Sequence, residues 1–137
     1  MHRRPTVTLL HPEALSNAAQ YAYAASVAPG ARMIFLAGAC PLNMDGTTAA
    51  VGDVTGQARK ALENMLVALE AAGAGITDVV FTRVLVASSD RADLLKAWRV
   101  VREAFGDHDV PRTLLGVTVL GYANQLVEIE AVAAVAP

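Results

Sequence analysis

The chain has 137 residues and a formal net charge of −2 at pH 7, a length that fits one domain of about 100 to 150 residues. Hydrophobic residues make up 54% of it and charged residues 18%, so we expect partner subunits to cover part of its apolar surface. No apolar run reaches the roughly 18 to 20 residues that cross a bilayer, and no Lys/Arg cluster marks a nucleic-acid binder. We therefore expect a single domain over residues 1–137, with neither a membrane nor a nucleic acid as partner.

Cys40 is the only cysteine, so we expect no internal disulfide and no thiolate zinc site. The N-terminal segment MHRRPTVTLLHPEAL is basic, but its apolar part is too short for the core of a signal peptide. The histidines do not have metal-ligand spacing. These features predict a cytoplasmic protein without a metal.

The first strands are short. Residues 6–10 are β-prone and end at His11-Pro12. Residues 21–27 and 33–36 flank a Pro29-Gly30 turn, so we expect them to form a hairpin.

Two segments then show helical periodicity. Apolar residues recur every three or four positions from Asp53 onwards, with Asp53 or Thr55 as the N-cap and Gly73 at the end. A β-branched run at 78–87 separates this helix from a second one, which begins after Ser88-Ser89-Asp90 and ends at Gly106.

Two further strands are expected at 113–120 and 126–135. The order β-β-β-α-β-α-β-β predicts an α+β two-layer domain with both helices on one face of the sheet. The strand at 78–87 has apolar residues at both odd and even positions, which is typical of a strand buried on both faces. Oligomerisation would cover the second face.

Five separated blocks of the sequence together carry a resemblance to a known family. They are YAASV at 23–27, LAGACPLN at 36–43, QARKALEN at 57–64, VPRT at 110–113 and EIEAVA at 128–133. In order and spacing they resemble the RidA/YjgF/UK114 family, also described as the endoribonuclease L-PSP family, over almost the whole chain.

The resemblance implies a fold, an assembly and an activity. The fold is a chorismate-mutase-like α+β domain that forms a homotrimer around a central barrel, with ligand clefts between subunits. The activity is cofactor-independent hydrolysis of small enamines or imines, such as 2-aminoacrylate, to a keto acid and ammonia.

Arg112 and Glu128 are the main candidate site residues. A guanidinium offers paired donors to a carboxylate, and the resemblance assigns Arg112 to binding the ligand carboxylate; the alternative is a surface arginine at a strand entry. The resemblance assigns Glu128 to positioning or activating water; the alternatives are a solvated strand face or an inter-subunit ion pair.

Tyr23 matches the family's active-site tyrosine, and Tyr21 is its competitor. Gly38, Ala37 and Leu114 are candidate ligand-binding positions. Ala37 replaces the usual serine and Leu114 the usual cysteine, so we expect a more apolar pocket that accepts a bulkier or different substrate.

The distance between the two main candidates also matters. A simple hairpin of the last two strands would pair Glu128 near Val117 and leave Arg112 about 17 Å away, so a shared site would need two subunits.

His108, in the loop before Arg112, is close enough in sequence to reach the pocket, although a solvated loop histidine is more common.

The sequence thus favours a deaminase that acts on a small carboxylate-bearing enamine or imine, with Arg112, Glu128 and Tyr23 as its catalytic residues. The alternative is a noncatalytic trimer that binds a small carboxylate or metabolite as a sensor or interaction module. Ribonuclease activity is disfavoured by the acidic balance.

Overall fold

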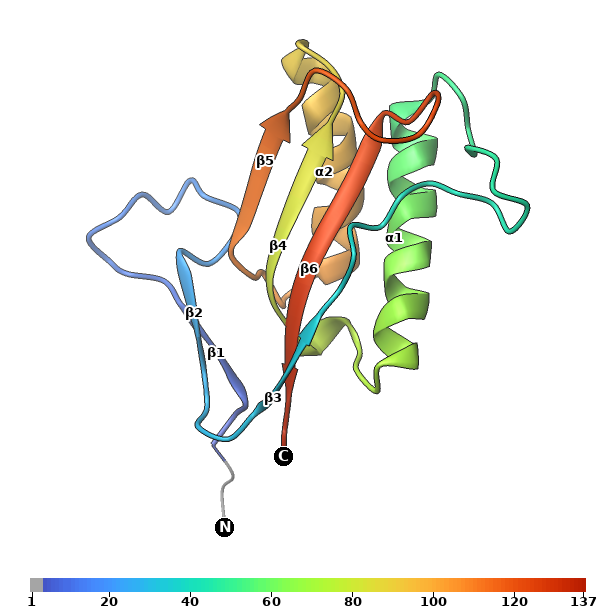
Figure 1. Cartoon of the computed structure of the whole chain (residues 1–137). Helices are drawn as coiled ribbons and strands as arrows, with labels where there is room; N and C mark the ends of the chain where they lie inside the picture. Colours follow the sequence, from blue (N-terminus) through green and yellow to red (C-terminus); the bar gives the residue numbers. More distant parts are fainter. Residues whose placement is uncertain (1–3) are drawn as a thin grey trace.

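The structure is a computed structural model that describes residues 4–137, so the first three residues of the basic N-terminal segment lie outside it. It contains two α-helices, one 3₁₀ helix and six strands (Figure 1). In chain order they are β1 (Val7–Leu10), β2 (Ala24–Val27), β3 (Arg32–Phe35), α1 (Val54–Ala71), η1 (Ile76–Asp78), β4 (Val79–Val86), α2 (Arg91–Phe105), β5 (Arg112–Gly116) and β6 (Val127–Val135).

The strands form two sheets. The main sheet has the order β3-β6-β4-β5, in which β5 runs parallel to β4 while β6 is antiparallel to both β3 and β4. Both α-helices pack on one face of this sheet (Figure 1). A separate two-stranded sheet joins β1 and β2. The predicted α+β architecture with both helices on one face is therefore confirmed.

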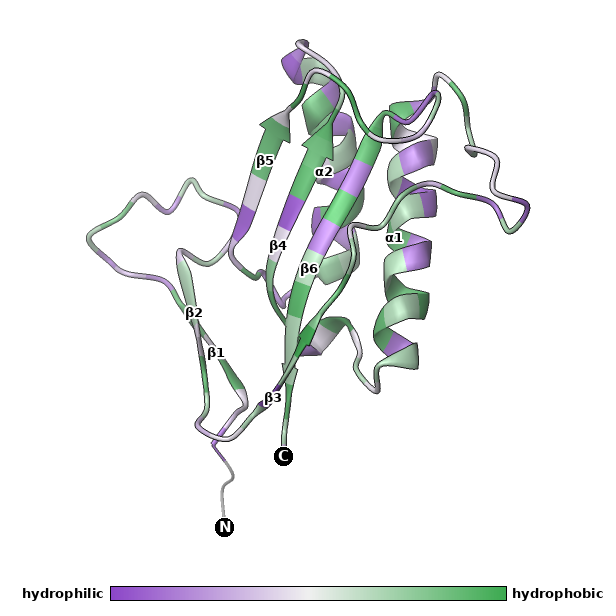
Figure 2. Ribbon diagram, viewed as in Figure 1, coloured by the Kyte–Doolittle hydropathy of each residue, from purple (hydrophilic) through white to green (hydrophobic). Residues whose placement is uncertain are grey.

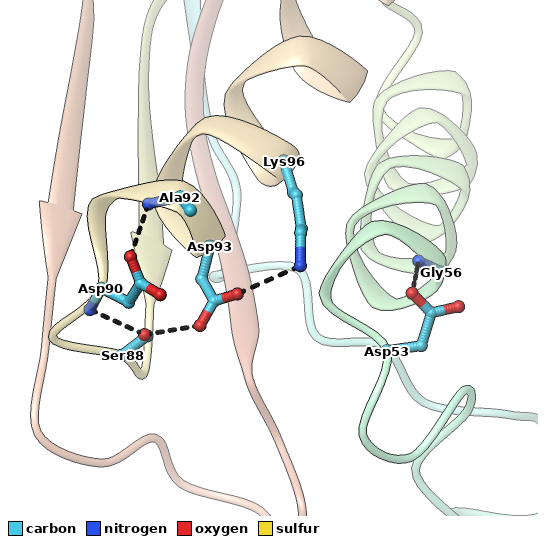
Figure 3. A network of polar contacts seen from close by, with 7 residues as sticks. All are labelled: Asp53, Gly56, Ser88, Asp90, Ala92, Asp93 and Lys96. Carbon is cyan, nitrogen blue, oxygen red and sulfur yellow. Dashed lines mark hydrogen bonds and ion pairs between the residues drawn. The ribbon is translucent and has the colours of Figure 1, made fainter.

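The helices begin where local sequence chemistry predicts. The Asp53 carboxylate accepts a hydrogen bond from the Gly56 N–H at 3.0 Å, and the Asp90 carboxylate accepts one from the Ala92 N–H at 2.9 Å (Figure 3). Each satisfies an N–H group that the first helical turn leaves without an intrahelical partner. Gly106 ends α2 with a φ of 55°, a left-handed value that favours glycine.

The core lies between the main sheet and the helices. Alternate residues of β6, Val127, Ile129 and Ala131, are buried against them, so Glu128 and Glu130 project from the opposite face. Figure 2 shows the same alternation as hydrophilic bands that interrupt the hydrophobic colour of β6. Over residues 4–137, no helix combines the length and apolar character needed to cross a bilayer.

The sheet face away from the helices is partly apolar. Phe35 is 75% exposed there, and its neighbour Met33 is exposed to 39%. On β4 the Arg83 guanidinium pairs with the Glu130 carboxylate across the sheet, with N–O distances of 3.0 Å. This surface, which we call the open face, is the one that the sequence predicts to be covered in an oligomer.

The predicted hairpin between residues 21–27 and 33–36 is wrong. The turn itself forms, since the Ala31 N–H donates to the Ala28 carbonyl and Gly30 has a φ of 81°. The strands on either side then diverge, because β2 pairs with β1 whereas β3 pairs with β6 and buries Ile34 in the core. A turn motif specifies the reversal of the chain but not the partner of each strand.

The simple hairpin of the last two strands is also absent, because β4 lies between β5 and β6. Strand β5 ends at Gly116, where its parallel register with β4 runs out at Val86, so residues 117–120 are not strand as predicted. The 3₁₀ helix η1 was not predicted.

Candidate functional site

Arg112 opens β5 and carries a buried charge. Its side chain lies on the helix side of the sheet, with the guanidinium carbon 5.0 Å from the ring centroid of Trp98 and 4.8 Å from that of Phe105. The residue is only 5% exposed, and none of its three guanidinium nitrogens has a hydrogen-bond partner among residues 4–137. The two α2 rings lie over the guanidinium, and its N–H donors are buried without the partners that such groups usually have.

Burial has an electrostatic cost at this position. It lowers the pKa of Arg112 to about 10; the negative charge of Asp109 acts against this shift, and the positive charge of Arg102 adds to it. The guanidinium is still protonated at neutral pH. A desolvated cation without a full counter-ion is stabilised strongly by an incoming anion.

Two hollows meet at Arg112. One, of about 400 Å³, is largely polar, and its lining includes Asn17, Gln20, Asp107 and Asp109. The other, of about 430 Å³, is more apolar than polar and is lined by Tyr21, Leu95, Trp98, Arg112, Thr113 and Leu114. A ligand held by Arg112 can therefore extend over either a polar or an apolar wall.

The two candidate tyrosines have different surroundings. Tyr21 lines the apolar hollow beside Arg112 and meets Trp98 edge to face, with ring centroids 5.6 Å apart. Tyr23, whose ring centroid is 6.0 Å from that of Tyr21, lines a neighbouring hollow of about 560 Å³ that Tyr21 also lines, and its hydroxyl donates to the Ser16 carbonyl at 2.7 Å. Within one chain, Tyr21 is thus the tyrosine next to the guanidinium.

Leu114 and His108 lie on either side of this region. Leu114 is two residues beyond Arg112 on β5, so it projects to the same side and lines the apolar hollow. His108 is half-buried, stacks on Phe105 and contacts the Val79 carbonyl through Nε2 at 2.7 Å. It supports the ring under the guanidinium and is not a solvated loop residue.

Glu128 lies in a second region, at the beginning of β6. The thiol of Cys40 donates to its Oε1 at 3.1 Å, and the Gln125 amide donates to the same oxygen at 3.4 Å. The other oxygen, Oε2, has no hydrogen-bond partner within the described part of the chain, and it lies so close to Gly38 that a Cβ there would be 2.7 Å from it. One carboxylate oxygen is therefore held and the other faces a glycine backbone.

Cys40 has the properties of a buried thiol. Its pKa is raised to about 11, first by burial and then by the hydrogen bond to Glu128 and the charge of that carboxylate. The thiol is thus protonated at neutral pH and is a hydrogen-bond donor, not a nucleophile.

The segment that carries Gly38 and Cys40 is anchored by helix α1. The Asn64 amide donates to the Cys40 and Leu42 carbonyls at 2.9 and 3.0 Å. Gln57, fully buried, donates to the Asn124 carbonyl and accepts from the Leu126 N–H. These two residues belong to the QARKALEN block, so the block's polar positions hold both loops that flank Glu128.

The candidate position Ala37 is exposed beside Gly38.

The two regions are separate within one chain. Arg112 pairs with Thr82 of β4 and Glu128 with Leu85, so they are about 10 Å apart along the strands and about 10 Å apart across them. They also project from opposite faces of the sheet. No group of three metal-ligating side chains occurs among the residues that the structure describes.

Several residues of these regions were not predicted as site residues. Trp98 and Phe105 lie seven residues apart on α2, a spacing that places both over one part of β5, but helical periodicity alone marks them only as apolar residues. Gln125 and Cys40 carried no recognisable signal, because their contact with Glu128 depends on how two distant loops meet.

Comparison with known proteins agrees with this architecture. A family model described as endoribonuclease L-PSP matches residues 12–135. A RutC family protein of Pyrococcus horikoshii is 36% identical over 100 residues, which cover 73% of this chain and 77% of that protein.

Solved structures give the same result. A protein of unknown function from the conserved Rid family of Yersinia pestis superposes with a TM-score of 0.87 at 27% identity, covering 96% of this chain and 100% of that one. TdcF of E. coli with bound serine gives a TM-score of 0.66 at 29% identity, covering 85% and 88%. With nearly its whole length matched by one family model and by these folds, the chain belongs to the RidA/YjgF family, the family of the endoribonuclease L-PSP model.

Proposed function

We propose that this protein is a cofactor-independent deaminase that hydrolyses a small enamine or imine bearing a carboxylate. The observation that carries the proposal is the Arg112 guanidinium, which is 5% exposed and has three nitrogens without a partner in residues 4–137. Such a group is matched by a carboxylate, which accepts two parallel N–H donors. The E. coli relative whose structure holds bound serine shows that one member accepts an amino acid.

Glu128 has the geometry of a group that handles water. Its Oε1 is engaged by Cys40 and Gln125, which leaves Oε2 to accept a proton. In the proposed reaction the water oxygen adds to the imine carbon while its proton passes to Oε2. Oε2 passes that proton to the nitrogen, which gives a carbinolamine, and then takes the proton of the new hydroxyl group and delivers it to the same nitrogen. The C–N bond breaks as the C=O bond forms, and a keto acid and ammonia leave.

The two regions come together in this proposal through a second subunit. Arg112 with Tyr21 would form one wall of a cleft, and Glu128 with Gly38 of a neighbouring subunit the other. The apolar open face with Phe35 supports an oligomer, because such a surface is unfavourable in water. A homotrimer is the assembly that the family resemblance implies.

The test supplies the imine as it forms. An amino-acid oxidase or a serine dehydratase generates it in the presence of this protein, and release of keto acid is measured above the spontaneous rate. We expect the native protein to accelerate release and Arg112→Ala to lower kcat/KM at least a hundredfold, since removing a buried charged contact costs several kcal/mol. Arg59→Ala, an exposed arginine on α1, is the matched control.

The alternative is a carboxylate-binding protein without catalysis. Ala37 favours it, because no hydroxyl donor lies next to Gly38 at that position. Equal keto-acid release with native protein and Arg112→Ala would overturn the deaminase proposal. If both are inactive while pyruvate raises the Tm of the native protein alone, the binding function is the correct one.

A further inference from the structure

The apolar hollow beside Arg112 bears on which substrates the proposed deaminase takes. Its volume of about 430 Å³ lies in the range of small-molecule pockets. The buried guanidinium that borders it has no partner within residues 4–137, so a bound carboxylate would sit at the edge of the hollow. The remainder of the ligand then has to contact the walls around it.

One wall of the hollow is a fixed aromatic surface. The indole N–H of Trp98 donates to the Gln20 side chain at 3.4 Å, and Tyr21 packs edge to face against the indole ring. The guanidinium lies over the same indole at 5.0 Å. Because the ring has neighbours on several sides, little side-chain entropy is lost when a ligand packs on it.

The remaining walls are aliphatic. Leu95 is 44% exposed on α2, and Leu114 projects from β5 on the same side as Arg112. Apart from Arg112, the polar atoms on the lining are the hydroxyls of Tyr21 and Thr113 and the indole N–H of Trp98, which already donates to Gln20, so a charged substituent would find few hydrogen-bond partners.

We infer that this hollow is a side-chain subsite and that the substrates are imines derived from bulky hydrophobic amino acids, branched or aromatic. The inference rests on the proposed function for the reaction itself. The carboxylate binds Arg112, the imine carbon points away from α2, and the hydrophobic side chain packs against Trp98, Leu95 and Leu114. An imine with only a methyl or methylene group leaves these walls in contact with water.

The kinetic test compares imines of different size. A D-amino-acid oxidase in excess forms them from D-alanine, D-leucine and D-phenylalanine, and keto-acid release is measured above the spontaneous rate. We expect kcat/KM to be at least about tenfold higher for the leucine and phenylalanine imines, because each buried methylene contributes roughly tenfold to discrimination.

The variant Leu95→Asp tests the subsite without disturbing the core, since Leu95 is a surface residue. A carboxylate there should lower kcat/KM for the leucine imine about tenfold and change the alanine imine by less than about threefold. Leu66→Asp on α1, where the leucine is 38% exposed, makes the same chemical change elsewhere and should alter neither.

A binding measurement makes the inference testable without turnover. Trp98 is the only tryptophan, so its fluorescence reports contact with the subsite directly. We expect 4-methyl-2-oxopentanoate to change this fluorescence with a Kd at least about tenfold lower than that of pyruvate, and Leu95→Asp to remove the difference.

The outcomes separate this inference from the proposed function. If the alanine imine is hydrolysed as fast as the bulky ones, the subsite is wrong and the deaminase stands. If no imine is hydrolysed, the deaminase is wrong and the binding measurement decides the subsite. Equal affinity for the two keto acids then overturns it.

Discussion

The Arg112 and Glu128 regions hold opposite charges in different ways. The guanidinium is covered by two aromatic rings and has no hydrogen-bond partner among residues 4–137, whereas one oxygen of the carboxylate is held by a thiol and an amide. The difference supports the proposal that Arg112 binds the ligand and Glu128 positions the water. A binding group is completed by its ligand, while a group that must present one atom to a water needs to be oriented beforehand.

The largest expected effect is the loss of activity when Arg112 or Glu128 is substituted, and its recovery when the two variants assemble together. Arg112→Ala and Glu128→Gln should each lower kcat/KM at least a hundredfold. After co-expression, mixed trimers should regain activity at about one of their three subunit interfaces, because only a native Arg112 next to a neighbour's native Glu128 completes a site. Mixed assemblies are purified through two affinity tags and assayed.

One control accompanies that experiment. Separately purified variants mixed briefly should stay inactive, which shows that exchange of subunits is required. If the co-expressed assemblies are no more active than the single variants, the two residues do not share a site across an interface.

A tenfold effect is expected from Gly38→Ala. The new Cβ would lie 2.7 Å from Oε2 and Cδ of Glu128, so the carboxylate has to move, at little cost in stability because it is the end of a flexible side chain. We expect kcat to fall about tenfold with a change in Tm of less than about 3 °C. Gly121→Ala, with no atom within 4 Å of the added methyl, should leave both unchanged. A native rate in Gly38→Ala would show that the position of Oε2 is unimportant.

A smaller effect is expected on stability at the Arg112 side. Since burial lowers the pKa of Arg112 to about 10, its charged form opposes folding at every pH below about 10, and this penalty is relieved as the pH rises further. Arg112→Met should therefore raise the free energy of unfolding of the unliganded protein by about 1 kcal/mol at pH 7. The gain should narrow above pH 10.

Urea unfolding measures this change, with Arg59→Met as the surface control. A loss of stability in Arg112→Met would mean that the guanidinium has a partner in the assembled protein even without ligand. Arg112 would then be held by a partner in the same way as Glu128, and the two regions would no longer differ in this respect.

The smallest effect concerns the contact between Cys40 and Glu128. The carboxylate raises the pKa of the thiol, so Glu128→Gln should lower that pKa and increase the thiolate fraction. Burial is the larger cause of the shift and is unchanged, so we expect alkylation by iodoacetamide at pH 8.5 to become only about threefold faster. Because Cys40 is the only cysteine, intact mass reports it directly. Glu130→Gln, on the same strand face, should leave the rate as in the native protein.

Some of these features could be predicted from local sequence. Asp53 and Asp90 cap the helices as expected because a cap is made by residues two or three positions apart. The period of apolar residues placed both helices and β6. The matched blocks indicate the family, and their polar positions Gln57 and Asn64 hold the loops that flank Glu128.

Strand pairing could not be predicted in the same way. The expected hairpin of residues 21–27 and 33–36 was wrong because β3 pairs with β6 and not with β2. The last two strands form no simple hairpin because β4 lies between β5 and β6. A strand's partner depends on which neighbour completes the buried face, and this is a property of the whole sheet.

The sequence by itself determined the element order, the helix ends, the family and a charged arginine at the entry to β5. Only the tertiary structure decided that Trp98 and Phe105 enclose that arginine, that Tyr21 and not Tyr23 lies beside it, and that Glu128 projects from the other face of the sheet. The reason is that helix periodicity and capping act over a few residues. Burial of a charge is set instead by segments that the fold brings together from distant parts of the chain.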